Sequence, residues 1–246
     1  YPMSGQQRGF CLIVNNFDFS CSKGPKNPEG TEIDEGKLSL VFSWLGFQVE
    51  VLRDATRDQM LSSMEKLAGR DHSGMDCVAC IVLSHGLKGG VYGVDGGEVQ
   101  LEELTDRLNG IGCPSLRGKP KLFFIQACQG NKRDSTGVLC SDASVASESL
   151  PSMADFLIAM STPPSYVSFR NGKEGTWFIQ SLCQNLVRLV PSQKDLASIL
   201  KEVIKDVSNK TDSKKRRQIP IYSTNILKLV VFPVPEGPRP SLPTSL

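Results

Sequence analysis

A cysteine and a histidine stand where two apolar runs end, and these two residue types can act together in catalysis. Cys128 follows the run 121–127, and His85 follows the run 81–84 and opens the glycine-rich stretch 86–90. A cysteine thiolate can attack a carbonyl carbon, and a neighbouring imidazole can help to form the thiolate or protonate the leaving amine. If both runs are neighbouring parallel strands, the two side chains meet at one edge of a sheet. The pair therefore indicates nucleophilic catalysis by cysteine.

The second histidine and a C-x-x-C pair are interpreted as structural. His72 lies in the polar triplet 71–73, where a turn or helix-capping role is expected. Cys77 and Cys80 lie inside the apolar run 77–83, and no second pair of cysteines or histidines stands at a spacing typical of metal ligands. We therefore expect two buried strand thiols, and neither a metal nor another cofactor.

Composition and charge argue against nucleic-acid or membrane partners. The chain has 246 residues, 39% of them hydrophobic, and a formal net charge of +2. That charge exerts no strong attraction on nucleic acid, and no apolar run approaches the roughly 20 residues of a membrane helix. Eight cysteines without a secretory leader predict reduced thiols and a cytoplasmic location. The basic run 214–217 is interpreted as a solvated loop, and a chain that begins with Tyr1 is expected to be a fragment.

Short apolar runs alternate with amphipathic helical patterns along the chain. Five runs predict strands, at residues 10–14, 47–52, 77–83, 122–125 and 156–160, and a final run at 226–232 predicts a last strand. Helices are expected near residues 38–45, 56–68, 176–190 and 192–207, with Thr56 and Ser192 as N-caps. Strand–helix alternation favours parallel neighbours in an α/β fold with a mostly parallel central sheet.

The segment around Cys128 matches a known active-site signature. Residues 126–130 read Gln-Ala-Cys-Gln-Gly, and the caspase signature Q-A-C-[RQG]-G is accompanied by a histidine about 50 residues upstream, a place that His85 fills. Further caspase landmarks follow in family order: Gly30-Thr31 with Asp34, and residues 71–73, 83–86, 154–156 and 167–170. The chain therefore resembles the caspases over nearly its whole length, and most closely the initiator members, which death-effector domains normally precede.

This resemblance implies a fold and a mechanism. The caspase fold is an α/β sandwich in which helices cover both faces of a mostly parallel central sheet. Cys128 would attack the scissile carbonyl and His85 would handle the proton, while the backbone N–H groups of Gly86 and Cys128 would form the oxyanion hole. The implied enzyme is a cysteine endopeptidase of the initiator type, which cleaves proteins after aspartate in apoptotic or inflammatory signalling.

The resemblance also implies a substrate pocket. Gln126 and Arg170 would bind the carboxylate of the aspartate before the cut, because a guanidinium offers such a group two parallel hydrogen bonds. Four further residues would line the neighbouring subsites: Tyr166, Phe169, Asn171 and Trp177.

One pocket position departs from the family. The caspases have a second arginine two residues before the Gly-Thr pair, and this chain has Pro28 there, which offers no side-chain donor. Since a hydrogen bond to a charged group contributes about 1.5–3 kcal/mol, losing it would weaken aspartate binding by roughly tens- to hundredfold. Cleavage after aspartate remains the expectation, with a weaker preference.

The irregular segment 131–153 gives the chain a two-part organisation. The resemblance assigns this segment to a linker between a large subunit, residues 1–142, and a small subunit, residues 154–246, which together form one catalytic domain. Asp142 and Asp134 are the sites at which a zymogen would cleave itself. Expected partners are protein substrates with aspartate before the cut, a second copy of the chain or a related caspase, and death-domain adaptors if an upstream prodomain exists.

Two other functions compete with this interpretation. A catalytically weak or inactive caspase homologue could act as a regulatory dimerisation partner; Pro28 favours it, whereas the presence of both Cys128 and His85 opposes it. A phosphate-binding α/β domain could use the glycines of residues 86–97, but the chain lacks the motif G-x-x-x-x-G-K-[ST].

Overall fold

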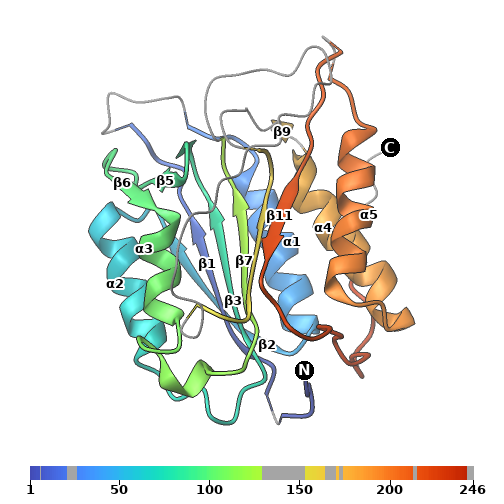
Figure 1. The fold of residues 1–246 in the computed structure, drawn as a ribbon. Coiled ribbons are helices and arrows are strands. Elements are labelled where there is room, and N and C mark those ends of the chain that lie inside the picture. The colour runs from blue at the N-terminus through green and yellow to red at the C-terminus, as the bar shows by residue number, and fades with distance from the viewer. Residues whose placement is uncertain are drawn as a thin grey trace.

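A six-stranded sheet forms the centre of the molecule (Figure 1). The computed structural model describes residues 1–5, 7–20, 27–128, 153–163, 170–171, 174–212 and 215–242. The strands lie in the spatial order β11 (Ile221–Thr224), β8 (Phe156–Met160), β7 (Lys121–Gln126), β3 (Val78–Leu83), β1 (Gly9–Asn15), β2 (Phe47–Arg53). β11 is antiparallel to β8, and all other neighbours in this sheet are parallel. The mostly parallel sheet and the first five predicted strands are confirmed.

Helices cover both faces of this sheet. One face carries α1 (Thr31–Trp44), α4 (Trp177–Leu189) and α5 (Leu196–Ser208), and the other carries α2 (Arg57–Ala68) and α3 (Leu101–Thr105) (Figure 1). Successive strand residues point to opposite faces, so Cys11 and Ile13 of β1 join the core under α1, whereas Leu12 and Val14 join the core under α2. β3 and β7 are buried along their whole length because both of their sides are covered. The expected sandwich architecture is confirmed.

The predicted helix starts were right at α2 and wrong at α5. Thr56 caps α2 in a capping box with Gln59, as the sequence predicts. Ser192, by contrast, ends a short 3-10 helix (Val190–Ser192), and the side chain of Asp195 caps α5 by accepting a hydrogen bond from the N–H of Ser198. Serine and aspartate are both favoured at N-caps, and the 3-10 helix that precedes α5 places Asp195 rather than Ser192 at the N-cap position.

The predicted last strand at residues 226–232 is also wrong. The edge strand is β11, and the chain from Asn225 onward leaves the sheet. Val230 and Phe232 are buried in the core under α5, and the N–H of Leu196 donates to the carbonyl of Val230 at 2.8 Å. Only these two residues of the run are buried, whereas Leu227 and Leu229 are exposed, and the backbone at Val230 pairs with the start of α5.

Short elements surround the upper edge of the sheet in Figure 1, where its parallel strands end. A three-stranded sheet contains β4 (Gly86–Leu87), β5 (Gly90–Tyr92) and β6 (Glu98–Gln100), and a hairpin contains β9 (Arg170–Asn171) and β10 (Gly175–Thr176). Elsewhere, two short 3-10 helices follow α3 in the chain, at Asp106–Leu108 and Pro114–Leu116. Within the described ranges, no helix is long and apolar enough to cross a membrane.

Candidate active site

The pairing of β3 with β7 brings the predicted cysteine and histidine to neighbouring positions. The two strands are parallel, with Leu83 opposite Gln126, and the N–H of Ser84 continues the ladder by donating to the carbonyl of Gln126 at 3.1 Å. His85 and Cys128 each lie two residues beyond that last pair. Both residues therefore leave the same edge of the sheet on adjacent strands, as the sequence predicts.

The backbone after His85 packs directly on the backbone of Cys128. A Cβ placed on Gly86 would lie 2.2 Å from the carbonyl oxygen of Cys128 and 2.8 Å from Cβ of Ala127. Such contacts are too short for any side chain, so glycine is required here for close approach. The N–H groups proposed for the oxyanion hole thus belong to two backbone segments in contact.

The two residues predicted to react are only partly shielded from solvent. Cys128 and His85 are half-buried, whereas the other cysteines in the described ranges are buried. Burial raises the pKa of the thiols of Cys77, Cys80 and Cys183, which keeps them protonated. Among the described cysteines, Cys128 is thus the one whose side chain is not buried.

Hydrogen bonds hold the backbone on each side of this pair. The N–H of Tyr92 in β5 donates to the carbonyl of His85 at 2.9 Å. The hydroxyl of Ser161, which follows β8, accepts from the N–H of Ala127 at 3.3 Å and donates to its carbonyl at 3.1 Å. The ring of Phe19 packs edge-on against the imidazole of His85, with 4.7 Å between ring centroids.

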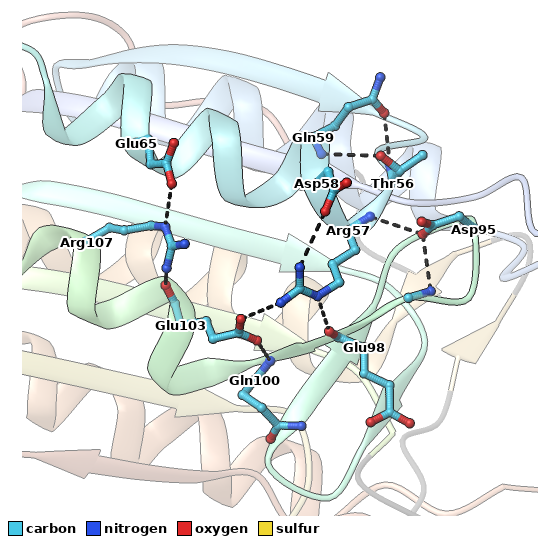
Figure 2. Close-up of polar contacts among 11 residues, drawn as sticks. Thr56, Arg57, Asp58, Gln59, Glu65, Asp95, Glu98, Gln100, Glu103 and Arg107 are labelled. Carbon is cyan, nitrogen blue, oxygen red and sulfur yellow. Dashed lines mark hydrogen bonds and ion pairs between the residues drawn. The ribbon is translucent and has the colours of Figure 1, made fainter.

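A polar network fixes the outer sheet of β4, β5 and β6 on α2 (Figure 2). Arg57, the first residue of α2, binds the carboxylate of Glu103 at 2.6 Å and the carbonyl of Glu98 at 2.9 Å. Asp95, in the turn before β6, accepts from the N–H of Arg57 at 3.1 Å and that of Gly97 at 3.2 Å. The segment of β4, β5 and β6, which begins at Gly86, is thereby attached to α2.

The hairpin of β9 and β10 is attached to the start of α1. Asp34 is fully buried in α1 and accepts hydrogen bonds from the N–H of Thr176 at 3.0 Å and from the side-chain amide of Gln180 at 2.7 Å. Thr176 lies opposite Arg170 in the hairpin. Pro28 is buried just before α1, so the backbone of Arg170 and the departing pocket position are both anchored at the start of this helix.

The other predicted pocket residues have different outcomes. Gln126 is buried at the end of β7, and Trp177 is the half-buried first residue of α4, packed against the core under that helix. The described part of the structure leaves out the side chains of Arg170 and Asn171. It also leaves out four predicted residues entirely: Tyr166, Phe169, Asp134 and Asp142.

His72 and the C-x-x-C pair have the structural roles expected of them. His72 is buried, and its Nε2 lies 2.9 Å from the carbonyl oxygen of Leu67 at the end of α2. Cys77 lies directly before β3 and Cys80 lies within it, and both are buried. In the described part of the chain, no group of three His, Cys, Asp or Glu side chains could hold a metal ion.

Three buried polar residues near this edge were not predicted as parts of the site. Asn16 and Ser84 follow β1 and β3, and Ser161 follows β8; all three are almost fully buried. A polar residue directly after an apolar strand is the signal that could have identified them, because such residues lie at the edge where parallel sheets bind ligands.

Comparison with known proteins assigns the chain to a family. The model of the peptidase C14 caspase domain matches residues 8–231. Caspase-8 of Rattus norvegicus is 42% identical over 253 residues, which cover 95% of this chain and 52% of the relative. Caspase-3 of Mus musculus is 38% identical over 242 residues, which cover 94% of this chain and 86% of the relative.

A solved structure supports the same assignment. The crystal structure of caspase-1 from Spodoptera frugiperda matches with a TM-score of 0.85 and 35% identity, over 95% of this chain and 94% of that chain. The chain spans about half the length of the caspase-8 relative. Sequence and fold agree, and the chain belongs to the caspase family.

Proposed function

We propose that this chain is the catalytic domain of a cysteine endopeptidase that cleaves proteins after aspartate. The observation that carries the proposal is the register of β3 and β7, which delivers His85 and Cys128 side by side at the carboxyl edge of the sheet. Neither residue is fully buried, which supports access of a peptide to both side chains.

The proposed reaction uses these two residues and their backbone. The thiolate of Cys128 attacks the scissile carbonyl carbon, and the resulting oxyanion accepts hydrogen bonds from the N–H groups of Gly86 and Cys128. The imidazolium of His85 protonates the leaving amine as the peptide bond breaks, which leaves a thioester on Cys128. Water, deprotonated by the imidazole, then hydrolyses the thioester and restores the thiol.

The proposed pocket for aspartate contains Gln126 and Arg170, with subsites formed by Tyr166, Phe169, Asn171 and Trp177. The attachment of the β9–β10 hairpin to α1 through Asp34 supports a position for Arg170 beside the reacting pair. Pro28 contributes no donor to this pocket. We therefore expect a preference for aspartate that is weaker by roughly tens- to hundredfold than that of a pocket with two arginines.

The proposal includes activation and partners. Residues 1–142 and 154–246 are the large and small subunits, and the linker 131–153 is cut after Asp142 or Asp134 when a zymogen is activated. Resemblance of residues 121–130, 175–183 and 229–235 to initiator members supports the initiator type in apoptotic or inflammatory signalling. Dimerisation with a second copy or a related caspase, and recruitment by death-domain adaptors, belong to the same proposal.

Pro28 favours a second function, that of a regulatory homologue with weak catalysis. Such a chain would keep the fold and the dimer contacts but bind substrate poorly. A peptide panel that varies the residue before the cut separates the two functions. Cleavage after aspartate that is abolished in Cys128→Ala supports the endopeptidase, whereas no turnover of any peptide, even by a forced dimer, would favour the regulatory homologue.

A further inference from the structure

The residue that follows β1 lies beneath the outer sheet that carries Gly86. Asn16 is fully buried, and its N–H donates to the carbonyl of Leu83 at 2.9 Å, which extends the pairing of β1 with β3. Its side-chain oxygen accepts from the N–H of Ala55 at 2.9 Å, and its side-chain nitrogen donates to the carbonyl of Tyr92 at 3.1 Å. One amide side chain thus connects β1, the start of α2 and β5.

A second side chain binds the same carbonyl. The hydroxyl of Ser84 donates to the carbonyl of Tyr92 at 2.6 Å. Tyr92 in turn donates its N–H to the carbonyl of His85. The hydrogen bonds of Asn16 and Ser84 therefore converge on the residue that holds the backbone of His85.

The loop after Asn16 holds the imidazole ring itself. Phe19 is buried, and its ring meets that of His85 at an interplanar angle of 68°. The carboxylate of Asp54 fixes this loop by accepting from the N–H groups of Phe17 at 2.9 Å and Asp18 at 2.8 Å. Phe19 is thus presented by a segment whose backbone is itself hydrogen-bonded.

We propose that Asn16, Ser84 and Phe19 are positioning residues for His85. Asn16 and Ser84 fix its backbone through Tyr92, and Phe19 fixes the orientation of its ring. This inference rests on the proposed catalytic role of His85.

The contact at Gly86 explains why small displacements of this backbone would matter. Gly86 is pressed against the carbonyl of Cys128, so a shift of residues 85–86 moves the imidazole and an oxyanion-hole N–H together. Displacements of about 1 Å in an active site can lower the rate by about 100-fold. The three side chains would therefore act on the chemical step rather than on substrate affinity.

Kinetics of matched variants test the proposal. Asn16→Ala and Phe19→Leu should lower kcat by about 100-fold, and Ser84→Ala by about tenfold, because Asn16 still binds the Tyr92 carbonyl in that variant. KM should change by less than about threefold in each. Ser84→Thr, which keeps the hydroxyl, should restore kcat.

Asn15→Ala is the matched control. Asn15 is equally buried and adjacent, but its side chain donates to Glu35 at 2.7 Å on the opposite face of the sheet. This variant should lose thermal stability and keep the kcat of the wild type. If Asn15→Ala lowers kcat as much as Asn16→Ala, general loosening explains both and the proposal is overturned.

The pH dependence of thiol alkylation gives a readout that a purely structural role would not change. Iodoacetamide reacts with the thiolate, so its rate at Cys128, followed by mass spectrometry of the tryptic peptide, reports the influence of the imidazole. The profile should move toward alkaline pH in Asn16→Ala and Ser84→Ala and stay in place in Asn15→Ala.

The outcomes separate this inference from the proposed function. If Cys128→Ala and His85→Ala abolish cleavage while Ser84→Ala and Phe19→Leu keep wild-type kcat and alkylation profiles, the positioning role is wrong and the proposed function stands. If Cys128→Ala still cleaves peptides, the proposed function itself fails. Should Asn16→Ala not fold, the milder Ser84→Ala and its Thr partner decide the question.

Discussion

The proposed reacting pair and the proposed substrate pocket are positioned by different kinds of structure. His85 and Cys128 stand on the regular ladder of β3 and β7, and hydrogen bonds from Tyr92 and Ser161 extend that order past the strand ends. The pocket hairpin lies outside the central sheet, and a buried carboxylate from α1, that of Asp34, attaches it.

This difference matches the demands of the two tasks. Bond making tolerates only displacements well below 1 Å. A register of backbone hydrogen bonds is rigid enough to hold two residues within that limit. Substrate preference changes by exchanging single side chains, and a hairpin with adjoining loops can accommodate such changes without disturbing the sheet. Pro28, at a proposed pocket position, would be an example of such an exchange.

The largest effect is expected from a methyl group placed between the two reacting segments. Gly86→Ala would put a Cβ 2.2 Å from the carbonyl oxygen of Cys128. It must therefore push apart the backbone segments that follow β3 and β7. Since this displaces a proposed oxyanion-hole donor, kcat should fall by about 100- to 1,000-fold, measured with an aspartyl peptide.

Gly36→Ala is the control for that substitution. Gly36 lies on the exposed side of α1, and a Cβ there would meet nothing within 4 Å. It should leave kcat unchanged and stabilise the fold by about 0.5–1 kcal/mol, as alanine does in helices. Full activity of a folded Gly86→Ala variant would show that the close approach is not needed for catalysis.

A gain of activity is expected on the pocket side. Pro28→Arg restores a guanidinium at the family's position and should raise kcat/KM for aspartyl peptides by roughly tens- to hundredfold. Pro28→Lys should give less, because a flexible ammonium cannot offer two parallel hydrogen bonds. Unchanged selectivity in a panel of peptides would indicate that another group already fills this role.

A smaller change should follow from weakening the attachment of the hairpin. Asp34→Asn keeps the shape of the side chain but replaces one of its two acceptor oxygens with an NH2 group. The N–H of Thr176 and the side-chain amide of Gln180 then have one acceptor oxygen in place of two. We expect about 2 kcal/mol less free energy of unfolding. KM for aspartyl peptides should rise about tenfold with kcat nearly constant.

The exposed Asp58 supplies the control for Asp34→Asn. Its side chain is 92% exposed and its ion pair with Arg57 lies at the surface, so Asp58→Asn should leave KM unchanged and lower stability by less than about 1 kcal/mol. A fall in kcat at constant KM in Asp34→Asn would contradict the comparison, because it would mean that the hairpin also positions the reacting pair.

The sequence predicted that His85 and Cys128 lie at the same edge of the sheet because the determinants of that placement are local. Runs such as 77–83 and 121–127 read as strands buried on both faces, and a polar residue at the end of each is visible without any knowledge of packing. The hydrogen bond between Asn16 and Tyr92 joins residues 76 positions apart, so it depends on how the outer sheet folds back. No periodicity carries that information.

The errors near the C-terminus have a related cause. Residues 226–232 have the apolar content of a strand, but burial of Val230 and Phe232 under α5 produces the same pattern. Strands of two or three residues, such as β9, are too short to show a period of two. Composition alone cannot distinguish these cases, since tertiary contacts decide them.

The smallest expected effect concerns a histidine on the side of the molecule that the chemistry does not use. Burial, aided by the nearby charges of Lys119 and Arg70, lowers the pKa of His72 below its ordinary value, and the hydrogen bond to the carbonyl of Leu67 and the charge of Asp71 oppose the shift only in part. The unfolded chain therefore binds a proton more readily than the folded one. Stability from this group is fully present above about pH 6.5, the unfolded value, and is lost as the pH falls below it.

Urea denaturation of the wild type and His72→Gln at several pH values between 7.5 and 5 measures this contribution. Gln removes the titration, so its free energy of unfolding should fall less steeply with acidity than that of the wild type, whatever the absolute cost of the substitution. Parallel slopes would mean that His72 titrates alike in both states. At each pH the folded fraction of the variant should have the same kcat as the folded wild type. The reason is that His72 contacts the end of α2 and not the edge where His85 and Cys128 meet.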